Sequence, residues 1–260
     1  MSKQDMNEID LLETWIGDML ESVNNFKEPI LDESIMKIMK ITCDAFKQDV
    51  HVFITAVEIL EEYMRRKYEK QECNYDQILI LAASLFISSK YTGVQIELKI
   101  KYINKILQRL TNVEYESKII ISAEVEILKT LDGSLPITTV VDDLNTIIEL
   151  HIRENHLKAN LRLLCLEILQ LLYICRKNLF MELKEIYNQN KDSLLVLKFL
   201  MNSKLYIPVC ILITSLHLTQ YKHILDINSM TNNITRLTKI HSDHLNILAG
   251  ILINLIQNNI

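Results

Sequence analysis

Residues 80–91 read Ile-Leu-Ala-Ala-Ser-Leu-Phe-Ile-Ser-Ser-Lys-Tyr, and this stretch says more about the fold than any other. A helix with this sequence is apolar on every face until it reaches Lys90. Other helices must surround it, because no side of it can face water. The small residues in its middle let those neighbours approach closely. We therefore expect a central bundle helix that ends in a lysine able to reach solvent or a partner.

The composition predicts helices throughout the chain. Of the 260 residues, 49% are hydrophobic and 23% are charged, a balance typical of packed domains and not of disorder. The chain has only four glycines and three prolines, far below average usage. No segment alternates apolar and polar residues over any length. We therefore expect an all-α protein with one or two domains.

The overall charge argues against a broad DNA-binding surface. The formal net charge is −5 and the pI is about 5.8, whereas a protein that binds the DNA backbone needs a basic face. The polar, acidic N-terminus does not resemble a signal peptide, and no apolar run reaches membrane length without a polar break. The five cysteines have no regular spacing, so we interpret them as reduced core residues of an intracellular protein.

The order of the predicted helices repeats along the chain. An amphipathic helix over residues 7–22 precedes five predicted helices that end near residue 131. Gly133 and Pro136 then mark a stop and a restart, and a similar series follows with a second all-apolar helix over residues 207–220. Tandem five-helix units with an N-terminal helix are therefore expected. The predicted domains are residues 1–28, 29–134 and 135–260.

Local signals place the ends and faces of several helices. Pro29 suits the first turn of a helix, Asp49 is expected to begin the next one, and Asn74 with Gln77 resembles a capping box ahead of the central helix. Trp15 lies beside the apolar face of the N-terminal helix. We expect Trp15 to pack on the first unit, and the alternative is an exposed anchor for a partner.

Three of the predicted helices resemble those of a cyclin box. Residues 56–64, Ala-Val-Glu-Ile-Leu-Glu-Glu-Tyr-Met, look like the second cyclin helix, usually Ala-Val-x-x-Leu-Asp-Arg-Phe-Leu. Residues 81–91 look like the third, which usually ends in Ala-Ser-Lys-Tyr, and residues 123–131 look like the fifth, with its Glu-x-x-Ile-Leu-Lys-x-Leu. Pro136 stands where cyclins have the proline that opens the second box. The resemblance implies tandem cyclin boxes, and hence a binding module.

The chain is more closely similar to one divergent meiotic family, that of cyclin N-terminal domain-containing protein 1. Phe26-Lys27-Glu28-Pro29 resembles this family's Phe-Arg-Glu-Pro ahead of the first box, and the resemblance covers roughly residues 20–260. It implies a nuclear protein that acts on meiotic chromosomes, where it promotes the maturation of designated crossovers at recombination sites. It also marks these four residues as a partner surface.

The first box helix departs from the pattern of kinase-activating cyclins. Those proteins usually carry Met-Arg-Ala-Ile-Leu and a downstream Trp, which form a groove for substrate docking motifs. Here residues 31–35 read Leu-Asp-Glu-Ser-Ile and Ile38 follows, so the Arg and the Trp are absent. The usual Glu-Glu after Lys-Tyr is replaced by Thr92-Gly93.

Lys90 and Glu124 are the residues that the resemblance marks as a kinase interface. In cyclins the matching Lys and Glu hold backbone groups near the regulatory helix of a cyclin-dependent kinase. Hydrogen bonds to such charged groups are worth roughly 1.5–3 kcal/mol each. Holding that helix in its active position would shift the kinase toward its active state. The alternative is an inherited, solvated salt bridge that contributes little energy.

Two further sets of side chains have ordinary interpretations. Lys101, Lys105 and Arg109 recur at every fourth position and line one helix face. We interpret them as a solvated face, and the alternative is contact with an acidic partner or DNA. No third cluster of ligand residues accompanies His241 and His244, so we expect a solvent-facing pair near a helix N-terminus and no metal site.

The sequence predicts a regulatory or adaptor protein and not an enzyme. It contains no nucleophile elbow and no Gly-rich phosphate loop, and no cofactor is expected. The expected partners are meiotic recombination proteins and a cyclin-dependent kinase, without sequence-specific nucleic-acid binding or membrane contact. One alternative is a scaffold whose boxes no longer touch a kinase. Another is a two-box transcription-initiation factor, against which the acidic pI and the lack of a zinc ribbon count.

Overall fold

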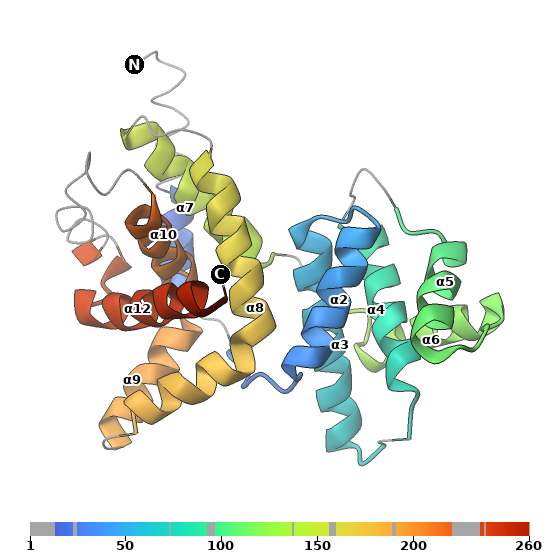
Figure 1. Ribbon diagram of the computed structural model, residues 1–260. Helices are drawn as coiled ribbons and strands as arrows, with labels where there is room; N and C mark the ends of the chain where they lie inside the picture. Colours follow the sequence, from blue (N-terminus) through green and yellow to red (C-terminus); the bar gives the residue numbers. More distant parts are fainter. Residues whose placement is uncertain are drawn as a thin grey trace. The chain divides into compact units, whose positions relative to one another are not determined.

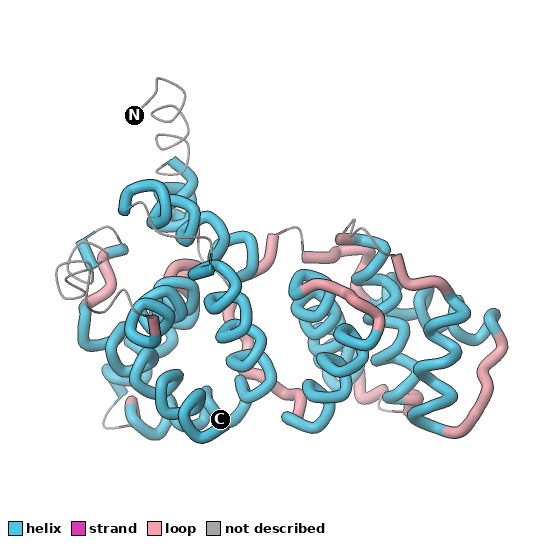
Figure 2. Tube along the Cα trace, turned by 45° about the horizontal axis from the view of Figure 1, so that its top comes forward, coloured by secondary structure: helices cyan, strands magenta, loops and turns pink. Residues whose placement is uncertain are grey.

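The computed structural model shows helices as the regular elements and no strand in the parts of the chain that it describes (Figures 1 and 2). Those parts are residues 14–22, 25–72, 74–92, 97–136, 138–155, 160–188, 191–219, 235–236 and 238–259. The predicted all-α fold class is confirmed. None of the described helices is both long and apolar enough to cross a membrane.

The chain divides into two compact units. The first unit is Pro29–Thr139, and the second unit combines Met1–Glu28 with Val140–Ile260. The predicted domain boundaries and the tandem cyclin boxes remain predictions.

The first unit is organised around helix α4 (Gln77–Tyr91), which contacts α3, α5 and α6 (Figure 1). Every residue over 80–89 is buried, as expected for a helix without a polar face. The predicted central helix is therefore confirmed. The other helices of this unit are α2 (Glu33–Ala45), α3 (Val50–Glu69), α5 (Ile100–Thr111) and α6 (Ser117–Thr130).

Two buried serines of α4, Ser88 and Ser89, form hydrogen bonds with neighbouring segments. The Ser88 hydroxyl donates to the carbonyl oxygen of Val52 at 2.7 Å. The Ser89 hydroxyl donates to Oε1 of Gln48 at 2.9 Å and accepts from the backbone N–H of Leu98 at 2.8 Å. These bonds satisfy polar groups that burial would otherwise leave unpaired. They also fix the position of α4 along α3.

Two of the three predicted helix starts in this unit need correction. Asp49 does cap α3, where its carboxylate accepts the N–H of a residue in the first turn. The cap of α4 is Asp76 and not Asn74, because only Asp76 directly precedes the helix and accepts two of its free N–H groups. Helix α2 begins at Glu33, so Pro29 lies ahead of it in irregular structure and not in its first turn.

A buried carboxylate explains the late start of α2. Glu61 of α3 is buried, and its Oε1 accepts the backbone N–H groups of Ile30 and Leu31 at 3.1 and 3.2 Å. Its Oε2 lies 3.7 Å from a guanidinium nitrogen of Arg65. Because these two N–H groups bond to a side chain, the segment ahead of α2 is held against α3 in a non-helical conformation.

The second unit is organised around another apolar helix, α10 (Tyr206–Leu218), which contacts α7, α8, α9 and α12 (Figure 1). Ten of its side chains are buried, so the second all-apolar helix is confirmed. A helix predicted near residues 225–240 falls mostly outside the described residues. The other helices are α7 (Val140–Asn155), α8 (Asn160–Ile186), α9 (Lys191–Asn202) and α12 (Ser242–Asn259), with a helical stretch over residues 14–21.

Trp15 was expected to pack on the first unit, but its side chain is 53% exposed. Trp15 is exposed, whereas Ile16 and Met19 of the same helical stretch are buried. These two residues lie three positions apart and share a face, so the helix turns Trp15 away from it.

Helix α7 carries two buried ionisable side chains whose pKa values shift in opposite directions. Burial lowers the pKa of His151 to about 4, and burial raises the pKa of Asp143 to about 6 although the charge of Lys204 works against that rise. Below pH 6.5 the unfolded chain protonates His151 before the folded chain does, so acid weakens the fold through His151. Between pH 6 and 3.8 the folded chain holds the Asp143 proton more tightly, so acid strengthens the fold through Asp143.

Asp143 opposes the loss of stability in acid that His151 causes. Replacement of Asp143 by Asn removes this opposing effect, so the stability of the variant should fall more steeply as the pH decreases. We expect the Asp143→Asn variant to be more stable than the wild type at pH 7 and to lose this advantage, roughly 3 kcal/mol, as the pH falls toward 4. Urea denaturation at stepped pH values measures this. A second variant that also carries His151→Gln should show a flatter pH profile. Parallel wild-type and Asp143→Asn profiles would contradict the assignment.

Replacement of Glu61 by Ala should destabilise the first unit. The change leaves the N–H groups of Ile30 and Leu31 without an acceptor in a poorly hydrated place, so we expect a loss of about 2–3 kcal/mol in urea denaturation. Glu61→Gln keeps an acceptor oxygen and should lose less. The matched control is Glu62→Ala, which removes an i,i+4 pair with Arg66 at the helix surface and should lose about 0.5 kcal/mol. Equal losses for the two alanine variants would refute the anchoring role of Glu61.

Candidate functional site

The structure brings together the two residues that the sequence nominated, Lys90 and Glu124. Nζ of Lys90, in the last turn of α4, donates to Oε1 of Glu124 on α6. The same ammonium lies 4.1 Å from the centroid of the Phe86 ring, a cation–π arrangement that also orients it. The side chains are 33% and 15% exposed, respectively. An ion pair that is neither buried nor fully solvated therefore lies at the surface where α4 ends.

Helix α6 places an apolar strip beside this pair. It buries Ile120, Ala123 and Ile127 and contacts α4. Ile121 and Val125 point outward, 47% and 42% exposed. These two lie at positions −3 and +1 relative to Glu124, so all three occupy one side of the helix. An exposed apolar strip of this kind is typical of surfaces that receive a partner helix.

We name Lys90, Tyr91, Ile121, Glu124 and Val125 the α4–α6 surface. Tyr91 directly follows Lys90 and is also exposed. The sequence predicted only the charged members. Ile121 and Val125 were missed, although their helical spacing from Glu124 is a signal that could have found them. Their exposure depends on which side of α6 packs against α4.

The charged pair keeps hydrogen-bonding capacity for a partner. An ammonium has three N–H donors and a carboxylate has two acceptor oxygens, and the pair uses one donor of Lys90 and Oε1 of Glu124. Because both side chains are partly exposed, the other donors and Oε2 can bind the backbone C=O and N–H groups of another chain. The arrangement can therefore hold a helix end, where such groups lack intrahelical partners.

Glu126, two residues further along α6, has a different role. Its Oε1 accepts the Tyr63 hydroxyl at 2.7 Å and lies 3.0 Å from Nζ of Lys67, both on α3. Lys67 also lies 2.9 Å from Glu72, and these two carboxylates raise the pKa of Lys67. Glu126 therefore joins α6 to α3, which fixes the helix that presents Glu124.

The segment Phe26–Pro29, predicted as a partner surface, is partly used within the second unit. The Phe26 ring lies 5.3 Å from the ring of Phe180 on α8, and its N–H donates to Oδ1 of Asn202 at 2.8 Å. The Glu28 carboxylate lies 3.3 Å from Nζ of Lys184. The chain thus occupies part of this segment itself.

The segment is nevertheless partly accessible to solvent. Lys27 and Glu28 are exposed, and Phe26 and Pro29 are half-buried. A partner could contact the charged heads, and this role stays a prediction.

His244 departs from the predicted solvent-facing histidine pair. His241 is exposed, with Nδ1 3.3 Å from the Asp243 carboxylate. His244 is half-buried, and its Nδ1 shares a hydrogen bond of 2.7 Å with the Tyr187 hydroxyl. Burial and the neighbouring His241 lower the pKa of His244. Among the described residues, no group of three His, Cys, Asp or Glu side chains is arranged to hold a metal ion.

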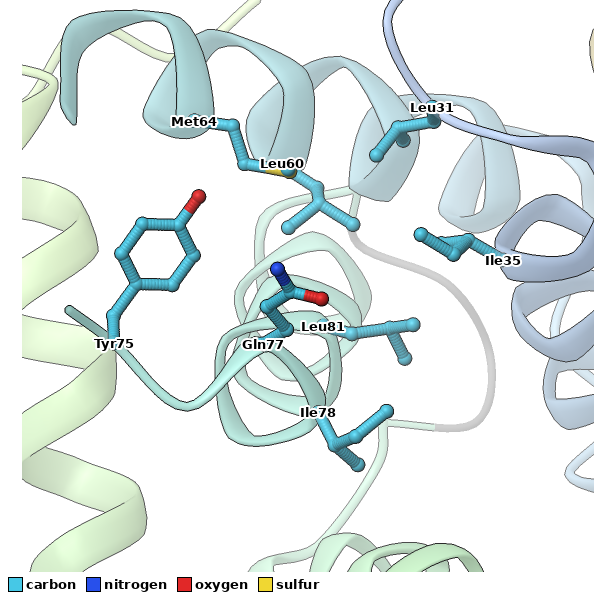
Figure 3. A pocket seen from close by; sticks show the side chains of 8 residues that line it. All are labelled: Leu31, Ile35, Leu60, Met64, Tyr75, Gln77, Ile78 and Leu81. Atoms are coloured by element: carbon cyan, nitrogen blue, oxygen red, sulfur yellow. The ribbon is translucent and has the colours of Figure 1, made fainter. Parts of the chain in front are cut away.

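A small, open apolar hollow lies between α3, α4 and the start of α2 (Figure 3). None of its lining residues carries a charge, and only Tyr75 and Gln77 bring polar tips to it. The Arg and Trp that kinase-activating cyclins usually carry on their first box helix are also absent from the α2 region. The hollow therefore suits an apolar side chain and offers no ionic contact. The remaining lining residues are Leu31, Ile35, Leu60, Met64, Ile78 and Leu81.

The described helices form an all-α fold, and its first unit carries the α4–α6 surface. Residues 18–136 match the family model of the cyclin, N-terminal domain. The match contains the α4–α6 surface and supports a cyclin-like family for this chain, with the regulatory role that is usual for this domain. None of the curated proteins compared with the chain matches it.

The Lys90–Glu124 pair should contribute little to stability. Because both side chains are partly solvated, a double-mutant cycle over Lys90→Ala and Glu124→Ala should give a coupling free energy below about 1 kcal/mol in urea denaturation. Lys37→Ala with Glu33→Ala, an exposed i,i+4 pair on α2, provides the reference cycle. A coupling above about 2 kcal/mol would identify the pair as a structural element instead of a binding site.

Proposed function

We propose that the protein is a cyclin-like regulatory subunit that binds a cyclin-dependent kinase through the α4–α6 surface. The observation that carries this proposal is the pairing of Lys90 with Glu124 at the protein surface beside the outward-facing Ile121 and Val125. The cyclin N-terminal domain match, which covers these residues, supports it. The cyclin resemblance of Lys90 and Glu124 supplies the kind of partner.

Each part of this surface has a chemical task in the proposal. Ile121 and Val125 would pack against the apolar face of a kinase helix and remove apolar area from water. Lys90 would donate to backbone carbonyl groups, and Glu124 would accept backbone N–H groups. Such contacts favour the active kinase only if they are made better in its active arrangement, because a ligand shifts an equilibrium by its differential affinity.

We further propose that the protein acts in the nucleus, on meiotic chromosomes, where it promotes crossover maturation together with recombination proteins. This setting rests on the resemblance of Phe26–Pro29 and of the first box to one meiotic family. Meiotic localisation of the tagged protein at recombination sites would support it.

A scaffold without kinase contact is the second candidate function. It is favoured by an exposed apolar face on α9 in the second unit, where Leu195 and Phe199 are 65% and 68% exposed and lie one helical turn apart. The uncharged hollow beside α2 is consistent with it, since a scaffold needs no substrate docking. The acidic pI disfavours the third alternative, a promoter-binding initiation factor.

Loss of both charged groups should weaken kinase binding. In pull-downs with purified candidate cyclin-dependent kinases, we expect the wild type to bind and the Lys90→Ala/Glu124→Ala variant to bind at least about tenfold more weakly, because two charge-assisted hydrogen bonds are lost. The matched control, Glu33→Ala/Lys37→Ala on α2, should bind like the wild type. Circular dichroism confirms that each variant is folded.

Equal binding by wild type and variant would place the kinase contact elsewhere. Absence of binding by the folded wild type would leave the scaffold. In that case Leu195→Asp/Phe199→Asp should disrupt assembly with recombination proteins.

A further inference from the structure

Helix α5 of the first unit exposes a row of cations that the proposed function does not use. Its buried side consists of Ile103, Ile106 and Leu107. The opposite side exposes Lys101, Lys105 and Arg109, which we name the α5 basic face. Four residues advance a helix by about 6 Å and by about 40° beyond a full turn. The three cations therefore form a slowly turning row with a spacing of about 6 Å.

No acidic residue within α5 balances this row. Helix α5 reads Ile-Lys-Tyr-Ile-Asn-Lys-Ile-Leu-Gln-Arg-Leu-Thr and contains neither Asp nor Glu. In the described parts of the chain, no ion pair involves any of the three cations. Two other helices of the first unit differ from α5, because α2 pairs Lys37 with Glu33 and α3 pairs Arg66 with Glu62.

These unbalanced cations slightly destabilise helix α5 in the isolated protein. Like charges at i,i+4 destabilise a helix by roughly 0.2–0.5 kcal/mol per pair. The cation at Lys101 also lies in the first turn, where the partial positive charge of the helix N-terminus disfavours it, and the N-cap, Lys99, makes no capping hydrogen bond through its side chain. An anionic partner would relieve both effects.

The row ends beside exposed apolar side chains. Leu110 follows Arg109 directly and Val113 lies just beyond the helix, and both are exposed. The row turns toward the side of Leu110, because each step of four residues rotates it by about 40°. A partner that follows the row would therefore meet cations first and apolar surface at its end.

We infer that the α5 basic face binds an acidic segment of a partner protein that carries an apolar residue at one end. A helical segment with carboxylates at every fourth residue reproduces the spacing of about 6 Å. An extended segment with carboxylates at alternate residues has a spacing of about 6.6–6.8 Å, which also fits. This inference stands apart from kinase binding, because it uses another helix and none of the residues of the α4–α6 surface.

Two observations favour an acidic protein over a nucleic acid. The chain as a whole is acidic, with a net charge of −5, so it repels a long polyanion but accepts a short acidic segment at a local basic face. Leu110 and Val113 offer apolar contacts that a phosphate backbone cannot use.

The test uses a fluorescent synthetic peptide with glutamates at every fourth position and a terminal leucine. Fluorescence anisotropy at low salt should show binding to the full chain, with weaker binding at high salt. The same peptide with glutamines should not bind. The Lys101→Gln/Lys105→Gln/Arg109→Gln variant should lose about tenfold or more in affinity, since three ion pairs are removed.

A matched charge control distinguishes the face from net charge. Lys191→Gln/Lys198→Gln/Lys239→Gln removes the same number of exposed cations from the second unit and should bind the peptide like the wild type. Equal weakening in both variants, or no binding of the glutamate peptide by the folded wild type at low salt, overturns the inference. Tighter binding of a duplex oligonucleotide that depends on the same three cations would replace the acidic segment with a nucleic acid.

Discussion

Helix α4 is apolar on every side over residues 80–89, so other helices must shield it from water. The arrangement of the first unit follows from this requirement. These residues of α4 are all buried, and α3, α5 and α6 contact the helix. The hydroxyl groups of Ser88 and Ser89 are buried with it, so the neighbouring segments must supply their hydrogen-bond partners. The burial of this helix thus sets both the packing of the unit and its internal polar contacts.

The candidate site is a consequence of where that burial ends. Lys90 is the first exposed residue after the buried run, and its ammonium lies over the Phe86 ring and against Glu124 of the helix packed beside it. Glu124 and Glu126 lie on the same helix but act differently. Glu126 bonds to α3 and fixes α6, whereas Glu124 stays at the surface and can be shared with a partner. Glu126 therefore supports the helix, and Glu124 provides the accessible charge.

The second unit meets the same constraint without producing the same site. Helix α10 is buried along its length, as α4 is, but it ends in His217 and Leu218 and has no lysine there. Both units bury their central helix, because that burial requires only an apolar sequence. A binding site needs a particular charged side chain at the exposed end, and only the first unit has Lys90. This difference is why the proposed kinase contact lies in the first unit.

The sequence by itself determined the helical class, the two buried central helices, the Asp49 cap and the nomination of Lys90 and Glu124, because these follow from composition, periodicity and local motifs. Only the tertiary structure decided the start of α2, which depends on the hydrogen bond that the Leu31 N–H donates to Glu61, 30 residues along the chain. The cap of α4 at Asp76 is a local contact with the first turn of that helix. The tertiary structure also decided that Trp15, Ile121 and Val125 face outward. Periodicity shows which residues share a helix face, but the packing of other helices decides which face is covered.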